Sequence, residues 1–286
     1  MVTPPAILIP AHNEAAVIER CLSALLADAE DTEFEICVVS NGSTDDTADV
    51  ARQALQNRAW SSVVELPKPS KIEALRTGDE VLHGFPRVYL DADVVLSTEA
   101  ARDLIAVLAA ADAPRVASPH IRIDDRSSPW AVRAYDRVWL QLPYVRKGLI
   151  GSGVYAVNEA GWVRKGAFPD VLNDDEYVRS IFGDHERLNS ADCFTMCAPR
   201  TVGALIRRRA RVAVGNADLI DRVPASGRRD TSLGSILSAV SASRVRPWDV
   251  GVYLIVTTAA IMLARVRRIV GTSNEWSTDL TSRVDT

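Results

Sequence analysis

The first hundred residues alternate between short, continuous apolar runs and segments whose apolar residues recur at helical spacing. The runs that predict buried strands are residues 6–10, 34–40, 62–66 and 87–97. The segments that predict amphipathic helices are residues 13–29, 43–55 and 70–82. Continuous apolar strands that alternate with helices are typical of a parallel sheet covered on both faces. The pattern therefore predicts an α/β fold with a mostly parallel sheet.

The same alternation continues after residue 97. The elements that it predicts are, in order, a helix (98–113), a strand (115–123), an aromatic-rich helix (128–145), a turn and strand (147–158), a loop and short helix (161–178), a strand (187–199) and a basic helix (200–216). We therefore expect one domain over residues 1–222, a linker over 223–247 and an apolar and basic helical tail over 248–286.

The tail contains an uncharged stretch from Val250 to Ala264, which is shorter than the roughly 20 residues needed to span a bilayer. We expect this stretch to form a helix packed on the core. The alternative is a helix at a membrane surface, with Arg265, Arg267 and Arg268 at the headgroups. A true membrane span is the least favoured of the three interpretations.

Composition limits the binding partners and the cellular compartment that we expect for the protein. The net charge of -4 is not that of an electrostatic nucleic-acid binder. No positively charged segment followed by an apolar run opens the chain, so we expect a cytoplasmic protein with free thiols. Peripheral contact with the inner face of the membrane is left open. Cys193 and Cys197 lack the two further ligands of a zinc site, and we interpret them as two buried residues on one face of a strand.

Polar side chains follow the predicted strands at the edge of the sheet where ligands bind in such folds. The first strand is followed by His12, Asn13 and Glu14 without a glycine, which argues against a dinucleotide fold and against a phosphate loop. Glu14 can accept hydrogen bonds from a ribose, and Asn13 can simply cap the next helix. The amide of Asn41, after the second strand, suits a nucleobase edge but also suits a cap.

Charged residues complete the polar edge. Lys71 begins a predicted helix, where it can meet a phosphate or remain solvated. Asp91 and Asp93 end the fourth strand two residues apart, on one face, and such a pair can hold Mg²⁺ or Mn²⁺. Asp174 and Asp175 belong to an acidic cluster, in which mutual repulsion raises the carboxyl pKa. This cluster is either a general base or a solvated helix start.

In this order, the segments resemble family 2 of the inverting glycosyltransferases, which have the GT-A fold, over residues 6–216. The matching segments are ILIPAHNEAAVIERCLSAL for the opening strand and helix, VVSNGSTDDT for D-D-G-S-T-D, SKIEALRTG for G-K-x-x-A-L-N-x-G, LDADVVLS for the D-x-D metal motif, GSGVYAV for the acceptor-side strand, NDDEYV for the E-D motif and RRRARVAVGN for R-x-x-R-W. The resemblance implies a nucleotide-binding half over residues 1–97 and an acceptor half over 98–222.

The resemblance also implies a nucleotide-diphosphate sugar donor and a Mn²⁺ or Mg²⁺ ion. Asp93 would bind the metal directly, and Asp91 would contact the ribose or the metal. The residues that would line the nucleotide-sugar site are Pro10, Ala11, Asn13, Glu14, Asn41, Lys71, Asp91, Arg208 and Arg211. For the two arginines, a solvated basic helix is the alternative.

On the acceptor side, the resemblance implies that Asp175 is the base, with Asp174 in the place of the family's Glu. An acceptor hydroxyl would then attack the anomeric carbon from the face opposite the diphosphate, with inversion. Residues Gly151, Ser152 and Gly153 would lie beside the acceptor. The acceptor itself is left open between a glycan, a lipid-linked sugar and a small molecule, in cell-envelope, glycolipid or natural-product synthesis.

Four positions depart from the family pattern. Ser40 and Asn41 replace the paired aspartates, so uridine is only the default base. Arg76 stands where the family commonly has Asn. Val212 replaces the Trp of R-x-x-R-W, which argues against processive polymerisation.

Two other functions are compatible with parts of the sequence. The segment YLDADVV also matches the signature of haloacid-dehalogenase phosphatases, in which Asp91 would be the nucleophile and Asp93 the acid and base. That signature normally opens the first strand of its domain, whereas three strand–helix units precede it here. The other rival is a non-catalytic, glycosyltransferase-like scaffold.

Overall fold

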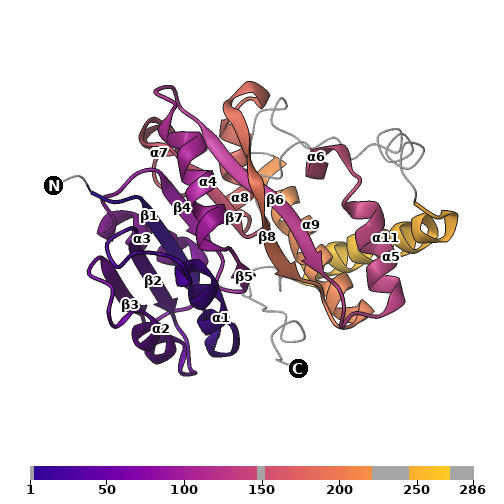
Figure 1. Ribbon diagram of the computed structural model, residues 1–286. Helices are drawn as coiled ribbons and strands as arrows, with labels where there is room; N and C mark the ends of the chain where they lie inside the picture. Colours follow the sequence, from indigo (N-terminus) through magenta and orange to yellow (C-terminus); the bar gives the residue numbers. More distant parts are fainter. Residues whose placement is uncertain (1–2, 147–151, 221–244, 271–286) are drawn as a thin grey trace.

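The computed structural model describes residues 3–146, 152–220 and 245–270, and in these residues the strands form one eight-stranded sheet (Figure 1). The sheet order is β3-β2-β1-β4-β7-β6-β8-β5. The strands are β1 (Ala6–Ala11), β2 (Glu35–Asn41), β3 (Ser61–Leu66), β4 (Arg87–Leu90), β5 (Val94–Val95), β6 (Val116–Asp124), β7 (Val154–Val157) and β8 (Arg187–Cys197).

The first four strands confirm the predicted parallel sheet. Strand β1 pairs in parallel with β2 and β4, and β2 pairs in parallel with β3. Strand β7 then runs antiparallel to both of its neighbours, β4 and β6, while β8 is parallel to β6. The resulting mixed, mostly parallel sheet places the carboxyl ends of β1, β2 and β4 at one edge.

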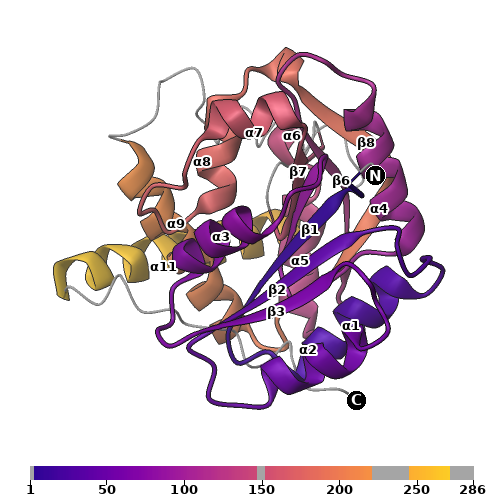
Figure 2. The same cartoon turned by 90° about the vertical axis from the view of Figure 1, so that its left-hand side faces the viewer.

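Helices cover both faces of the sheet (Figure 2). The side chains of β1 alternate between two cores, with Ile7 and Ile9 in one cluster and Ala6 and Leu8 in the other. The first core is closed by α1 (Ala15–Leu26), α2 (Thr47–Leu55) and α4 (Thr98–Ala109). The second core is closed by α3 (Lys71–Val81), α7 (Glu159–Lys165) and α8 (Asp174–Ile181). Burial on both faces explains why these strands are apolar throughout.

Three elements differ from the predicted pattern. The predicted strand over residues 87–97 is two strands, because β4 ends at Leu90 and a turn precedes β5. The predicted helix over 128–145 is divided into α5 (Trp130–Trp139) and α6 (Pro143–Arg146), since Pro143 cannot continue a helical hydrogen-bond ladder. Helix α7 falls within a segment that we expected to be a loop.

The two strand cysteines also need a correction. Cys193 and Cys197 lie on one face of β8, as expected, but they are half-buried, and the core face of this strand carries Phe194 and Met196. In the described residues, no group of three His, Cys, Asp or Glu side chains could hold a metal ion.

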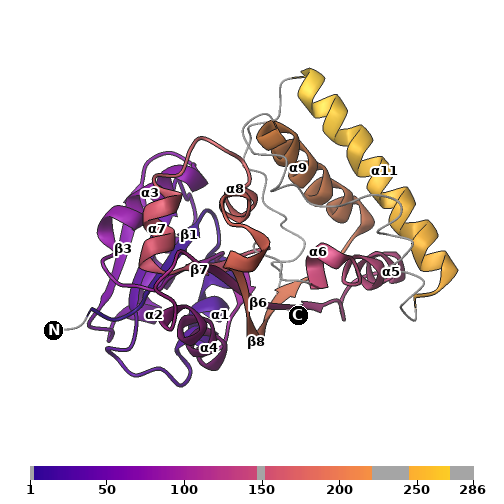
Figure 3. The ribbon, with the colours of Figure 1, turned by 90° about the horizontal axis from the view of Figure 1, so that it is seen from above.

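A separate helical layer packs beyond the β6–β8 end of the sheet (Figure 3). It consists of α5, α9 (Val202–Ile220) and α11 (Pro247–Val270), which lie against one another. Asp249 of α11 is fully buried and accepts hydrogen bonds from the Arg137 guanidinium, at 2.7 and 3.0 Å. The guanidinium of Arg209 lies 4.4 Å from the ring centroid of Trp139. The predicted linker falls mostly outside the described residues, and its last residue, Pro247, begins α11.

Asp136 is a buried carboxyl group in this helical layer. It is 4% exposed, and among the described residues its Oδ2 atom has no hydrogen-bond partner. Burial raises the pKa of Asp136 to about 6, although Arg209 and Arg208 oppose the shift. The folded protein therefore binds this proton more tightly than the unfolded chain does, and the associated stability is lost as pH rises from about 4 through 6.

We expect Asp136→Asn to remove this pH-dependent loss. A pKa shift from 3.8 to about 6 corresponds to about 3 kcal/mol of unfolding free energy at neutral pH. Urea unfolding should therefore show the variant about 2–3 kcal/mol more stable than the unchanged protein at pH 7.5, with the difference shrinking at pH 4.5. The exposed Asp112→Asn is the matched control. An equal difference at both pH values would contradict the assignment.

Candidate active site

The end of β2 is tied to two other segments by Asn41, which is fully buried. Its side-chain Nδ2 donates to the carbonyl of Ala11 at 2.7 Å, and its Oδ1 accepts from the backbone N–H of Ser70 at 2.9 Å. The Nδ1 atom of His12 lies 2.7 Å from the Asn41 carbonyl oxygen. The amide thus joins the ends of β1 and β2 to the start of α3. Contact of the same amide with a nucleobase stays a prediction, and it would require these bonds to break.

Asn13 and Glu14 shape the turn after β1. Asn13 has a φ of 53°, a left-handed conformation that Asn tolerates, and its Oδ1 accepts from the Thr44 N–H at 2.8 Å. The Asn13 side chain therefore stabilises the loop after β2, and it does not cap α1, the helix that follows it in the chain. The backbone N–H of Glu14 donates to Thr47 Oγ1 at 2.8 Å. The candidate residues Pro10, Ala11 and Glu14 are buried, while Asn13 is half-buried.

Lys71 is the centre of the candidate site. It is the first residue of α3, after the cap Ser70, whose side chain accepts from the N–H of Glu73. The Lys71 ammonium lies 2.7 Å from Asp91 Oδ1 and 2.9 Å from Asp174 Oδ1. Burial alone would lower the pKa of Lys71, but the two carboxylates hold it above its ordinary value. Lys71 is therefore charged, and it joins the end of β4 to the start of α8.

Asp174 is the buried member of the acidic pair, with a side chain 5% exposed. Its Oδ2 atom accepts from the Tyr155 hydroxyl at 3.2 Å, and its Oδ1 atom faces Lys71. Burial raises the pKa of Asp174, and Lys71 opposes this effect, while Asp175 and Asp91 add to it. Both oxygens of Asp174 are therefore engaged by the protein.

Asp175 is half-buried and points to the acceptor-side loop. Its Oδ2 accepts from the backbone N–H of Ser152 at 3.1 Å, and its Oδ1 accepts from the N–H of Glu176 at 2.7 Å. The start of α8 thus presents one carboxylate inward and one outward. Gly151, the first of the three acceptor-side candidates, lies outside the described residues.

The two aspartates of D-x-D lie in a turn and not on a strand face. The Asp91 N–H donates to the Gly153 carbonyl at 2.8 Å, and the Val94 N–H donates to the Asp91 carbonyl at 3.1 Å. Gly153 has a φ of 102°, and a Cβ atom there would lie 2.5 Å from Val94 Cγ2 and 3.5 Å from Asp91 Oδ2. Glycine is therefore needed for β7 to approach this turn.

The turn fits a divalent ion that completes its coordination with substrate oxygens. Among the described residues, no hydrogen bond or ion pair engages the Asp93 carboxylate, while Asp91 is 35% exposed. In the part of the chain that the structure describes, no third acidic or imidazole side chain joins this pair in a ligand group. Two carboxylates still fit Mg²⁺ or Mn²⁺, which often bind one or two carboxylates together with phosphates.

The two candidate arginines of α9 occupy different positions. Arg208 Nη2 contacts the sulfur of Met196, and Met196 is the β8 partner of Val94, which follows Asp93. Arg208 therefore lies beside the D-x-D turn. Arg211 is exposed about one helical turn further along α9.

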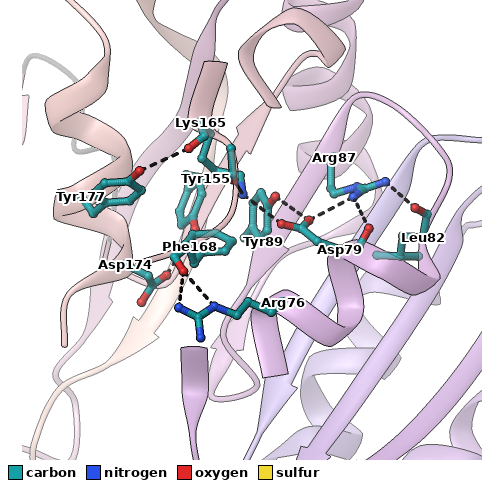
Figure 4. Close-up of polar contacts among 11 residues, drawn as sticks. Arg76, Asp79, Leu82, Arg87, Tyr89, Tyr155, Lys165, Phe168, Asp174 and Tyr177 are labelled. Carbon is teal, nitrogen blue, oxygen red and sulfur yellow. Dashed lines mark hydrogen bonds and ion pairs between the residues drawn. The ribbon is translucent and has the colours of Figure 1, made fainter. Parts of the chain in front are cut away.

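A buried polar network that the sequence analysis missed lies beneath the site (Figure 4). Asp79 Oδ1 accepts from Arg87 Nη1 at 3.0 Å and from the Tyr89 hydroxyl at 2.8 Å. Asp79 Oδ2 accepts from the Lys165 ammonium at 2.9 Å. Arg87 and Lys165 have almost no exposed side-chain surface. The only available sequence signal was Asp79, one of three acidic residues in the helix that begins with Lys71.

The network reaches the acidic pair through stacked rings. The rings of Tyr89 and Tyr155 are stacked with centroids 4.8 Å apart, and the Tyr155 hydroxyl donates a hydrogen bond to Asp174 (Figure 4).

Arg76, one of the departures from the family pattern, donates from Nε to the Phe168 carbonyl at 2.8 Å. It thereby fixes the loop that connects α7 to α8.

With this geometry established, the chain can be placed among known proteins. Residues 6–159 match the model of glycosyl transferase family 2. This match covers more than half of the chain, so the protein belongs to that family. The resemblance to glycosyltransferase family 2 is confirmed, and this family assignment argues against the phosphatase interpretation. The non-catalytic scaffold belongs to the same family and stays an alternative.

Two curated relatives match shorter segments. Glycosyltransferase AglE of Haloferax volcanii is 33% identical over 92 residues, which cover 31% of this chain and 30% of that protein. Uncharacterized protein MT1568 of Mycobacterium tuberculosis is 34% identical over 93 residues, covering 28% and 29% of the two chains. The matches thus span under a third of the length of these relatives.

Solved structures establish the fold as GT-A. Mannosyltransferase PcManGT of Pyrobaculum calidifontis, solved with GDP-Man and Mn²⁺, has a TM-score of 0.58 at 21% identity, covering 95% of this chain and 86% of that one. Glucosyl-3-phosphoglycerate synthase of Mycobacterium tuberculosis, solved with Mn²⁺, UDP and glucosyl-3-phosphoglycerate, has a TM-score of 0.53 at 20% identity, covering 78% and 81%. The predicted fold class is confirmed.

Gly153→Ala should destabilise the D-x-D turn more than an ordinary glycine substitution would. Gly166→Ala is the matched control, because its φ is 63° and an added Cβ would meet no atom within 4 Å. We expect the control to lose about 1–3 kcal/mol of unfolding free energy from backbone strain, because its φ of 63° and ψ of -161° lie in a region that is essentially restricted to glycine. Gly153→Ala should lose at least 1 kcal/mol more in urea unfolding, since its Cβ also displaces Val94. Equal losses would show that β7 and the turn do not pack as described.

Proposed function

We propose that the protein is a metal-dependent, inverting glycosyltransferase that moves one sugar from a nucleotide-diphosphate donor to an acceptor hydroxyl. The observation that carries this proposal is the position of Lys71, whose ammonium holds Asp91 and Asp174 on opposite sides of one centre. The carboxylates proposed for the metal and those proposed for proton transfer are thereby brought into one site.

On the donor side, Asp93 and Asp91 would hold Mn²⁺ or Mg²⁺, which would neutralise charge on the leaving diphosphate. Arg208, beside the same turn, would add positive charge. The ends of β1 and β2 would contact the nucleoside. UDP is the default nucleotide of the proposed donor. The similar structures include one complex with GDP-Man and one with UDP, so the base of the donor nucleotide has to be determined by experiment.

On the acceptor side, Asp175 would act as the general base. The acceptor oxygen forms a bond to the anomeric carbon while the bond from that carbon to the diphosphate oxygen breaks. The diphosphate leaves with the electron pair, and the acceptor proton moves to an oxygen of Asp175. Asp174 is buried and paired with the Lys71 ammonium, whereas Asp175 is half-buried and accepts from two backbone N–H groups. Asp174 is therefore assigned to positioning Lys71 and the start of α8.

For the acceptor, we propose only a broad class of molecules. Val212 in place of Trp favours single transfer over polymerisation. A glycan, a lipid-linked sugar or a small molecule would approach past Ser152, in the synthesis of cell-envelope glycans, glycolipids or natural products. We propose cytoplasmic localisation for the catalytic domain.

Nucleotide release tests the proposed reaction. The protein is incubated with UDP-, GDP- and dTDP-sugars and Mn²⁺, with mixed glycan and lipid-linked acceptors. We expect release from one nucleotide class, reduced at least about a hundredfold in Asp93→Ala because the metal site is lost. The exposed Asp112→Ala should match the unchanged protein. Metal-dependent phosphatase activity without turnover of any nucleotide sugar would overturn the proposal.

The two acidic residues at the start of α8 can be separated by their amides. Asp175→Asn should keep stabilisation by the nucleotide diphosphate and Mn²⁺ in thermal melts, yet lose transfer by about 10²–10⁴-fold. Asp174→Asn should reduce transfer less and should lower stability, because it weakens the buried pair with Lys71. Normal turnover in Asp175→Asn with none in Asp174→Asn would move the base to Asp174.

A further inference from the structure

Helix α11 has two apolar faces, and within residues 3–146, 152–220 and 245–270 only one of them is covered by other elements. Its buried stripe is Tyr253, Val256, Ala260 and Ala264, which pack on α5 and α9. Large apolar side chains are also exposed on α11, and these are Trp248, Leu254, Ile255, Ile261, Met262, Val266, Ile269 and Val270. Ile255 is 71% exposed and Ile269 is 85% exposed. Figure 3 shows α11 as the outermost helix of its layer.

The helix is long and apolar enough to cross a membrane by composition alone. It has 24 residues, and its most apolar 18-residue window has a mean hydropathy of 1.6 and is 28% buried. Its packing argues against a span. The ion pair of the buried Asp249 with the partly exposed Arg137 fixes its first turn to the domain. Helix α9 lies along α11 and carries four arginines, Arg207, Arg208, Arg209 and Arg211. A span would carry these charges into hydrocarbon.

The charges of α11 indicate what covers its outer face. Between Val250 and Val270 the only charged side chains are Arg265, Arg267 and Arg268, and there is no acidic residue. All three lie in the last turns of the helix. Arg265 and Arg268 are exposed and flank the stripe of Val266 and Ile269, whereas Arg267 is half-buried and continues the packed stripe of Ala260 and Ala264. Arginines next to an apolar stripe match a bilayer surface, in which acyl chains lie beneath anionic headgroups. Trp248, at the other end, is of a residue type enriched at membrane interfaces.

We propose that the outer face of α11 binds the surface of a bilayer that contains anionic lipids, with the helix lying in the interface plane. The outer face is defined by Leu254, Ile255, Ile261, Met262, Val266 and Ile269, with Arg265 and Arg268 as its charged end. The proposal does not depend on the transfer reaction.

This surface is connected to the candidate active site through α9. Asn173, which precedes α8, donates from Nδ2 to the Val212 carbonyl at 3.2 Å and to Asn216 Oδ1 at 2.7 Å. An added Cβ at Gly215 would meet the Asn173 side chain at 2.4 Å. Helix α9 therefore contacts both α11 and the start of α8, and membrane binding would place the acceptor side near the lipid surface.

Vesicle binding by the full chain tests the proposal, without any substrate. Cosedimentation is measured with phosphatidylcholine vesicles and with vesicles that also contain phosphatidylglycerol. We expect binding to the anionic vesicles that weakens with salt. The double variant Ile255→Glu, Met262→Glu should reduce binding at least about tenfold, and so should the triple variant Arg265→Gln, Arg267→Gln, Arg268→Gln. Val163→Glu, an equally exposed apolar position on α7, should bind normally.

Three results would overturn the proposal. The first is no binding to either vesicle. The second is unchanged binding by the double variant, which would place the contact elsewhere. The third is light scattering that shows a dimer which the double variant converts to a monomer, without vesicle binding. That result would assign the outer face of α11 to a second copy of the chain.

Discussion

The arrangement of the candidate site depends on one ammonium group placed between carboxylates. Lys71 faces Asp91 at the end of β4 and Asp174 at the start of α8. Without a cation at this position, two acidic side chains from distant parts of the chain would repel each other in a poorly solvated space. The position of Lys71 follows from its place as the first residue of α3, which itself is tied by Ser70 to Asn41 of β2.

Helix α3 also places charged side chains beneath the site. One end carries Lys71, its middle carries Arg76, which holds the loop before α8, and its last turns carry Asp79. Asp79 is paired with Arg87 and Lys165, and these charges are tolerated in the core because each has close opposite partners. Through the stacked rings of Tyr89 and Tyr155, this network supports Asp174 from the side opposite Lys71. One helix of the first 97 residues therefore contacts the segment that contains α7 and α8 and holds it in place.

Local pattern predicted most of the fold, because the strands are buried on both faces and the helices keep one apolar stripe. The elements of the first eighty residues lie close to their predicted ranges. Pattern failed where distant contacts decide the conformation. The turn at Asp91 is fixed by the Gly153 carbonyl, so no local signal could end β4 there. The site residues were grouped by the family resemblance, but the pairing of Lys71 with two carboxylates, and the inward and outward orientations of Asp174 and Asp175, required the tertiary structure.

The pH dependence of stability in Lys71→Met tests the central role of this lysine most directly. Removing the ammonium leaves Asp174 and Asp91 uncompensated, so a loss of about 3 kcal/mol of unfolding free energy is expected at pH 8. The loss should shrink at pH 5, because the burial that raises the pKa of Asp174 then lets it bind a proton and relieve the repulsion. The exposed Lys68→Met should show no such dependence. A loss in Lys71→Met that is equal at pH 5 and pH 8, or absent at both, would contradict the account.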